Sequence, residues 1–258
     1  MSATPTPPEP FGDRLLEEGR GLVEQAAERG LTVRLMGGIG IRTVLGDRFP
    51  ERFARAYGDI DIIVGRRDAR AVEELLAGRG WDPATAFNAL NGSRRLLFHD
   101  PAGSAQVDVF VDAFEMCHAL PLGESLQRPG PALPATDLLM SKLQIVALNA
   151  KDRSDLYALL EGCDVRDGDH RSIEPDRVAA LTGRDWGLHH TFELNLGRLR
   201  EGLACAEAPA ALGTPIDAIA QAMERAPKTR AWKLRARIGE RKRWYEDPEE
   251  VDRTTEAG

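Results

Sequence analysis

The sequence has few cysteines and no long apolar run, and each absence excludes a class of protein. Three cysteines in 258 residues, Cys117, Cys163 and Cys205, match neither a zinc site nor a disulfide framework, which indicates a reducing, cytoplasmic setting. No segment approaches the roughly 20 apolar residues of a membrane helix. The N-terminus also lacks the basic start and apolar stretch of a signal peptide. We therefore expect no membrane partner.

Two common nucleotide-binding signatures are also missing. The segment Gly38-Ile39-Gly40 lacks the third glycine of a dinucleotide-binding turn, and no acidic residue ends a second strand at the usual distance. No P-loop is present, and the histidines share no metal-binding spacing. The sequence therefore gives little support to an oxidoreductase that uses a dinucleotide.

The charge of the chain is uneven. The net charge is −7, yet residues 228–243 hold eight Lys and Arg side chains against Glu240 alone. This distribution argues against general nucleic-acid binding and leaves a local basic arm. Such a helix could contact RNA through its cations and tryptophans, or it could be an arm that binds the acidic remainder of the protein. We favour a solvated helix that docks through an apolar line, formed by Ala231, Leu234, Ile238 and Tyr245.

The pattern of apolar residues predicts an α/β fold, with a small mixed sheet, followed by a helical C-terminal part. We expect a disordered tail over 1–12, a catalytic core over 13–134 and a helical domain over 135–250, joined at Pro134. Expected early helices cover 13–29, 39–46 and 69–77, and expected strands cover 32–36, 60–64, 94–99 and 105–112. Expected later helices cover 138–148, 154–160, 178–181, 186–203, 216–223 and 232–245.

Asp59 and Asp61 lie two residues apart in a predicted strand, so their carboxylates share one face about 6–7 Å apart. Asp108 lies in another strand and can join them if the two strands are neighbours. Two such charges 5 Å apart repel by roughly 3 kcal/mol at an effective dielectric near 20. Divalent cations reverse that repulsion, and hard oxygen ligands suit Mg²⁺. The pair alone is also compatible with an exposed strand face.

Gly37-Gly38 follows a predicted strand and precedes a predicted helix. Glycines at this position let the backbone approach a phosphate, and the helix N-terminus favours its charge. By itself the pair could equally form an ordinary tight turn. Its position upstream of the two aspartates makes a nucleotide site the better interpretation.

The order of strand, Gly-Gly, helix, Asp-x-Asp strand and later Asp resembles the DNA polymerase beta-like nucleotidyltransferase superfamily over about residues 31–112. The resemblance implies that Gly37 and Gly38 hold a nucleoside triphosphate such as ATP, and we count Arg42 on the following helix with them. It implies that Asp59, Asp61 and Asp108 bind two Mg²⁺ ions, and that Asp108 also helps to deprotonate the acceptor hydroxyl. Asp112 is the rival for that third acidic role.

Lys142 falls on the apolar arc of a predicted helix, where an ammonium group needs a partner such as a phosphate or a carboxylate. Its head could instead reach solvent. Lys142, followed by Asp152 and Asp155, and Arg55 four residues before Asp59 resemble the AbiEii-type toxin nucleotidyltransferases. That resemblance implies that Lys142 contacts phosphate and that Asp152 acts near the acceptor or as a base. Asp152 could equally be a helix N-cap.

These observations predict transfer of a nucleoside monophosphate from a nucleoside triphosphate to an acceptor hydroxyl, with release of pyrophosphate. The acceptor could be a small molecule such as an antibiotic, or tRNA or a protein in a toxin–antitoxin system with an antitoxin partner. The alternative is a non-catalytic nucleotide-binding or interaction protein on the same fold. The sequence leaves the acceptor, the nucleotide base and the oligomeric state open.

Overall fold

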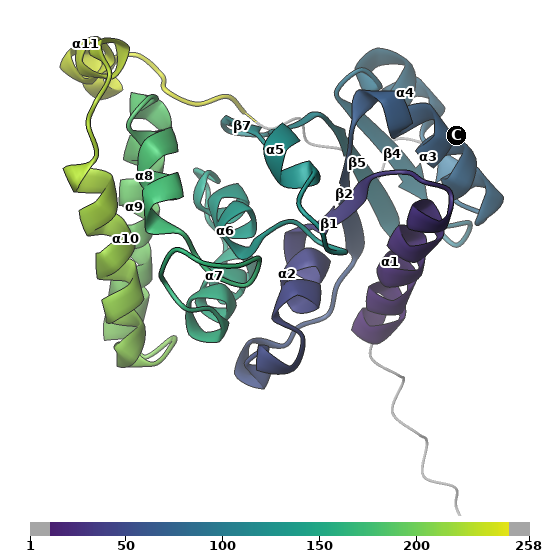
Figure 1. Ribbon diagram of the computed structural model, residues 1–258, viewed down its shortest axis with the longest axis horizontal. Coiled ribbons are helices and arrows are strands. Elements are labelled where there is room, and N and C mark those ends of the chain that lie inside the picture. The colour runs from purple at the N-terminus through teal and green to yellow at the C-terminus, as the bar shows by residue number, and fades with distance from the viewer. Residues whose placement is uncertain (1–10, 248–258) are drawn as a thin grey trace, which may run out of the picture.

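The computed structural model describes residues 11–247 and, in its N-terminal half, contains a five-stranded mixed sheet with helices on both faces (Figure 1). The strands are β1 (Val33–Met36), β2 (Asp59–Val64), β3 (Asp82–Pro83), β4 (Arg95–His99) and β5 (Gln106–Val111). Their order is β1-β2-β5-β4-β3, in which β2 and β5 are parallel neighbours at the centre. A two-stranded hairpin follows, formed by β6 (Ala113–Glu115) and β7 (Ala119–Pro121).

The two faces of the sheet differ because successive side chains of a strand point to opposite sides. Ile60 and Ile62 of β2 are fully buried on the face that α1 covers, where Gly19 of α1 approaches Ile60. Asp59 and Asp61 point to the other face. The N-terminal helices are α1 (Phe11–Glu28), α2 (Gly37–Leu45), α3 (Arg66–Gly78), α4 (Thr85–Asn91) and the short α5 (Gly123–Leu126).

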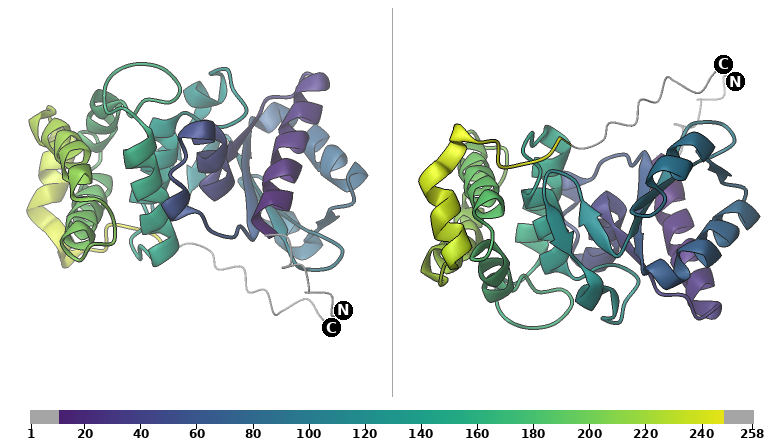
Figure 2. Two further views of the ribbon diagram at one scale, coloured as in Figure 1. Left: turned by 90° about the horizontal axis from the view of Figure 1, so that it is seen from below. Right: turned by 90° about the horizontal axis from the view of Figure 1, so that it is seen from above.

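The C-terminal half is helical, and Figure 2 shows its helices stacked beyond α2, on the side of α2 away from α1. The helices are α6 (Ala135–Leu143), α7 (Ala150–Gly162), α8 (Pro175–Thr182), α9 (Trp186–Ala204), α10 (Gly213–Arg225) and α11 (Arg230–Ile238). One buried apolar cluster runs from Leu15 to Met223, so both halves contribute to the same core. The predicted small mixed sheet followed by helices is therefore confirmed.

Several predicted elements have different bounds or were missed. The helix expected over 138–148 starts at Ala135 and ends at Leu143, so Ile145 and Val146 lie in a loop. The sequence did not indicate α4, which precedes β4, or the β6–β7 hairpin. The expected tail falls mostly on residues 1–10, which lie outside the described residues, and α1 begins at Phe11.

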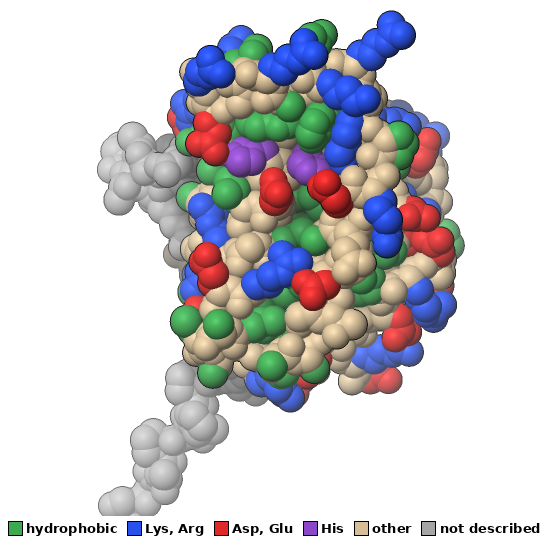
Figure 3. All heavy atoms as spheres, turned by 90° about the vertical axis from the view of Figure 1, so that its left-hand side faces the viewer, with side chains coloured by type: hydrophobic (Ala, Val, Ile, Leu, Met, Phe, Trp, Pro, Cys, Tyr) green, Lys and Arg blue, Asp and Glu red, His purple; other side chains and the backbone are tan. Residues whose placement is uncertain are grey.

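The basic helix was also predicted too long. α11 ends at Ile238, before Gly239 with φ +60°, and Tyr245 lies beyond it. Leu234 and Ile238 remain 61% and 45% exposed, so the apolar line does not dock the helix as expected. Trp232 instead packs edge-on against His189 of α9, with ring centroids 5.3 Å apart. The basic side chains of this helix gather along the upper edge of the face in Figure 3.

No helix among residues 11–247 has both the length and the apolar character to cross a bilayer. Cys117 and Cys163 are buried and Cys205 is exposed, and all three are free thiols.

Candidate functional site

The central strands place two of the predicted aspartates side by side. β2 and β5 are parallel and in register, with Asp61 directly opposite Asp108, while Asp59 precedes them on the same face of β2. Burial raises the pKa of the Asp61 carboxyl well above its usual range, and repulsion from Asp59 and Asp108 raises it further. The structure thus gathers Asp59, Asp61 and Asp108 on one partly buried part of the sheet, which we call the carboxylate patch.

Two neighbouring side chains donate hydrogen bonds to the carboxylate of Asp108. Arg95 of β4 donates from Nε to Asp108 Oδ1 at 2.7 Å, and Gln106 donates from Nε2 to Oδ2 at 3.2 Å. Within the described part of the chain, no three Asp, Glu, His or Cys side chains converge closely enough to hold a metal ion by themselves. A cation at this patch would therefore need further oxygen ligands from a substrate.

The Gly37-Gly38 turn lies directly against the aspartates. Gly37 has φ +60°, a conformation that glycine adopts without strain, and a Cβ on it would overlap the carboxylate of Asp61. A Cβ on Gly38 would overlap the guanidinium of Arg55 and touch the Tyr57 ring at 2.9 Å. Gly37 therefore requires glycine, and a side chain at Gly38 would displace Arg55 and Tyr57. The turn opens α2, whose first amides point toward this patch.

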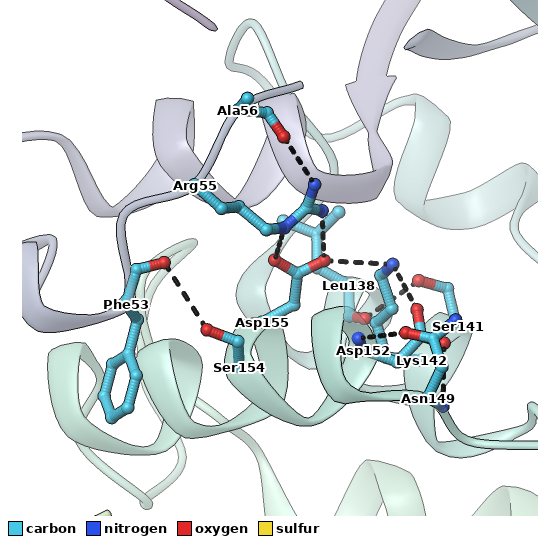
Figure 4. Close-up of polar contacts among 10 residues, drawn as sticks. All are labelled: Phe53, Arg55, Ala56, Leu138, Ser141, Lys142, Asn149, Asp152, Ser154 and Asp155. Carbon is cyan, nitrogen blue, oxygen red and sulfur yellow. Dashed lines mark hydrogen bonds and ion pairs between the residues drawn. The ribbon is translucent and has the colours of Figure 1, made fainter. Parts of the chain in front are cut away.

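A buried ion network joins α6 and α7 to the segment before β2 (Figure 4). Lys142 Nζ lies 2.9 Å from Asp152 Oδ1 and 3.0 Å from Asp155 Oδ2. Arg55 forms a bidentate pair with Asp155, from Nε to Oδ1 at 3.0 Å and from Nη2 to Oδ2 at 2.8 Å. Its guanidinium also lies over the Tyr57 ring, 4.9 Å from the centroid. Each buried charge thus has an opposite charge beside it.

The network keeps its groups ionised despite burial. Burial alone would raise the pKa of the Asp155 carboxyl, but Lys142 and Arg55 outweigh it and lower that pKa. Burial alone would lower the pKa of Lys142, but Asp155 and Asp152 raise it instead. The charge of Lys142 also partly offsets the raised pKa of Asp61. Lys142 is therefore a permanent cation close to the carboxylate patch.

The remaining predicted residues occupy defined positions. Asp152 is not the N-cap of α7, because Asn149 has that role and Asp152 completes its capping box from the third helical position. Asp155 follows in the second turn. Arg42 of α2 pairs with Glu51 at 2.8 Å. Asp112 lies past the end of β5 with φ +65° and accepts from the backbone N–H of Arg66 at 2.9 Å, away from the Asp61–Asp108 pair.

Two cations beside the carboxylates were absent from the predicted site. Arg55 resembled a subgroup pattern, but only the structure brings it against Gly38 and Asp155. Arg95 is one strand away from Asp108, and its sequence gave no signal because the β4–β5 register was unknown. The carboxylates of Asp61 and Asp108 thus lie beside two arginines from other segments of the chain.

No protein-family model and no curated protein sequence matches this chain. Solved structures that are similar to it include the following three. The crystal structure of ANT(2")-Ia in complex with adenylyl-2"-tobramycin is 15% identical, with a TM-score of 0.38, over 55% of this chain and 86% of that one. The solution structure of the antibiotic-resistance factor ANT(2'')-Ia is 15% identical, with a TM-score of 0.37, over 56% and 80%. An antigenic nucleotidyltransferase-like protein from Paracoccidioides brasiliensis is 13% identical, with a TM-score of 0.45, over 85% and 96%.

Proposed function

We propose that this chain is a metal-dependent nucleotidyltransferase of the DNA polymerase beta-like superfamily. It moves a nucleoside monophosphate from a nucleoside triphosphate to an acceptor hydroxyl and releases pyrophosphate. The observation that carries this proposal is the register of β2 and β5, which sets Asp61 beside Asp108 with the Gly37 turn against the Asp61 carboxylate. Carboxylates and a glycine turn at a helix N-terminus are what a cation-bound triphosphate needs.

The donor set of the patch fits Mg²⁺. This ion is commonly held by one or two carboxylates together with substrate phosphates, so Asp59 and Asp61 suffice as its protein ligands, with Asp108 as a third. The raised pKa of Asp61 reflects crowded negative charge that a cation relieves. When bound, two Mg²⁺ ions neutralise charge on the attacking and leaving oxygens of the displacement.

The protein's own groups position the substrates. We assign the backbone amides after Gly37 and Gly38, together with Arg42, to the phosphates. An ammonium has three N–H donors, of which Lys142 uses two on Asp152 and Asp155, so the third remains for a phosphate. We assign Asp108 to accept the proton of the acceptor hydroxyl. Asp152 acts through Lys142, because its carboxylate holds the ammonium in place.

The acceptor is the finer part of the proposal. A small hydroxylated antibiotic is one candidate, and tRNA or a protein is the candidate that the AbiEii-type resemblance implies, with an antitoxin as a further partner. A labelling experiment separates them. The full chain is incubated with each α-labelled nucleoside triphosphate, Mg²⁺ and either total tRNA or a panel of antibiotics, and label on the acceptor is counted.

We expect label on one acceptor class from the wild type, none after chelation of Mg²⁺, and none from an Asp59→Asn, Asp61→Asn variant. An Asp112→Asn variant is the matched control and should label normally, because Asp112 lies away from the pair. The proposal is wrong if the wild type labels no acceptor above the level of the double variant.

A second candidate is a non-catalytic nucleotide-binding protein. It is favoured by one observation, namely that Asp108 is already paired with Arg95 and that no three acidic side chains converge among residues 11–247. This candidate predicts a thermal shift with a nucleoside triphosphate and Mg²⁺, but no labelled product with any acceptor.

A further inference from the structure

A cleft of about 780 Å³ lies between the β6–β7 hairpin, the start of α9 and the segment that follows α11. Three of the four tryptophans of the chain line it, Trp186, Trp232 and Trp244, together with Tyr245. Basic side chains also line it: Arg94, Arg184, Arg235, Lys242 and Arg243. We call this the aromatic–basic cleft. No residue of the carboxylate patch belongs to it.

The basic residues of the cleft fall into two groups. Arg94 pairs with Glu115, Arg243 pairs with Asp247, and Arg235 donates to three backbone carbonyls. Arg184 and Lys242 are exposed, and neither has a hydrogen bond or ion pair from its side chain to any described residue. The first group builds the cleft, and the second is available to an anion.

The aromatic rings are held in place around the same space. Trp244 donates from Nε1 to Thr191 Oγ1 at 3.0 Å, and the ring of Trp186 is edge-on to it, with centroids 6.4 Å apart. The Trp186 ring stacks on His190, with centroids 4.9 Å apart, and the Arg235 guanidinium lies 4.6 Å from its centroid, so Trp186 supports the wall of the cleft. All three tryptophans are partly exposed. Sites for single-stranded nucleic acid combine aromatic rings, on which bases stack, with basic side chains, which pair with phosphates. The cleft holds both kinds of side chain.

The cleft continues toward the carboxylate patch. A smaller hollow shares Arg94, Glu115, Met116 and Glu246 with it and also includes Arg95 and Phe110. Arg95 binds Asp108 at 2.7 Å, and Phe110 is two residues from Asp108 on the same face of β5. A flexible ligand lying in the cleft can therefore extend along β5 to the carboxylates.

We propose that the aromatic–basic cleft binds the single-stranded end of a nucleic-acid acceptor, with its bases on Trp232 and Trp244 and its phosphates on Arg184 and Lys242. This inference rests on the proposed nucleotidyl transfer for its purpose, because the terminal hydroxyl would then reach Asp108. The cleft is lined by five basic side chains against three acidic ones, Glu115, Asp185 and Glu246, so its charge favours an anionic acceptor over a polycationic one.

Tryptophan fluorescence tests the binding without any turnover. Trp81, the tryptophan outside the cleft, is buried and bonded to Glu18, so quenching reports on the cleft. The full chain is titrated, without nucleoside triphosphate, with an eight-residue oligouridylate, the matching oligodeoxynucleotide and an aminoglycoside. We expect saturable quenching by the oligonucleotides only. If one of the two oligonucleotides binds more tightly, it shows whether the cleft prefers RNA or DNA.

An Arg184→Ala, Lys242→Ala variant should bind the oligonucleotide at least 10-fold more weakly. The slope of the logarithm of its binding constant against the logarithm of the salt concentration should become shallower by about 0.7 for each lost phosphate contact. The matched control is Arg20→Ala, Arg29→Ala, which removes two exposed cations, one in α1 and one in the turn after it, outside the cleft, and should bind normally. The proposal is overturned if the oligonucleotides cause no saturable quenching, or if both double variants bind equally.

The two proposals fail separately. An Asp59→Asn, Asp61→Asn variant should still quench with the oligonucleotide, because the patch lies outside the cleft. If oligonucleotides bind the cleft but no acceptor is ever labelled, the transferase proposal fails and the binding site stands. If a small polycation is labelled at equal rates by the wild type and by the Arg184→Ala, Lys242→Ala variant, the transferase stands and this assignment of the cleft is wrong.

Discussion

Gly37 and Asp61 lie in direct contact, with no room for a side chain between the turn that opens α2 and the carboxylate on β2. The carboxylate is thereby fixed against the backbone that we assign to the triphosphate. The sheet register adds Asp108 on the other side of Asp61. Three segments distant in the sequence thus determine the position of one side chain.

A Gly37→Ala substitution should abolish nucleotidyl transfer and destabilise the fold by about 1–3 kcal/mol, because a side chain with φ +60° is strained and this one also displaces Asp61. Gly46→Ala is the matched control. Gly46 has φ +55° but its Cβ would meet nothing within 4 Å, so it should lose stability and keep activity. Labelling rates and urea denaturation of both variants measure the difference. Equal activity of the two variants would contradict the contact.

Asp108→Asn should lower the labelling rate at least about 100-fold, because a carboxylate that neutralises or accepts a proton in the transition state contributes several kcal/mol. Asp112→Asn should leave the rate within a few-fold of the wild type, since its side chain only holds Arg66 and asparagine tolerates its backbone conformation. Rates are compared at saturating nucleotide. The opposite order of effects would assign the third acidic role to Asp112.

Asp155→Asn should destabilise the protein by about 3–5 kcal/mol at pH 7, because Lys142 and Arg55 lose the charge that compensates their burial. The folded-state pKa of Asp155 is lowered, so its contribution to stability is complete above the unfolded pKa of about 3.9 and is lost as the pH falls through the folded value. The difference between wild type and variant should therefore shrink only below about pH 4.

Urea denaturation at pH 7 and at pH 3 measures this effect. Asp217→Asn is the control, because Asp217 pairs with Arg200 on the surface and such pairs contribute at most about 1 kcal/mol. A small effect of Asp155→Asn at pH 7 would mean that the network contributes little to folding.

His189 should make the protein less stable in mild acid. Burial, together with the charges of Lys228 and His190, lowers its pKa to about 4. The unfolded chain therefore binds more protons between about pH 6.5 and pH 4, and unfolding becomes easier by about 3 kcal/mol as the pH falls through that window. His189→Phe keeps a ring beside Trp232 and should remove this part of the pH dependence. If the free energies of unfolding of the wild type and the variant change in parallel between pH 7 and pH 4, His189 does not cause the loss of stability in acid.

Local patterns were sufficient to predict the main elements around the site. The Gly37-Gly38 turn, the alternation of Asp59 and Asp61 with isoleucines, and the later strand with Asp108 all rest on neighbouring residues. The pairing of Asp61 with Asp108 depends on strand register, and nothing in either segment specifies the partner of the other. For the same reason the position of Arg95 could not be predicted.

The end of α6 shows how tertiary contacts override a local pattern. The apolar periodicity continues past Leu143, so the sequence predicted a longer helix. Buried Asn195 of α9 donates from Nδ2 to the carbonyls of Leu143 and Ile145, each at 2.8 Å, and thereby satisfies the open end of the helix. No local signal in α6 announces a cap supplied from about 50 residues downstream.

The shared partner Asp155 has a consequence for how the chain could be engineered. One carboxylate from the helical half neutralises Arg55 at the glycine turn and Lys142 of α6 at once. The N-terminal half expressed by itself would keep Arg55 without its counter-charge, and the apolar surface that meets α6 and α7 would face water. The two halves are therefore not interchangeable modules, and a chimera that grafts a foreign helical half must supply an acidic residue at this point.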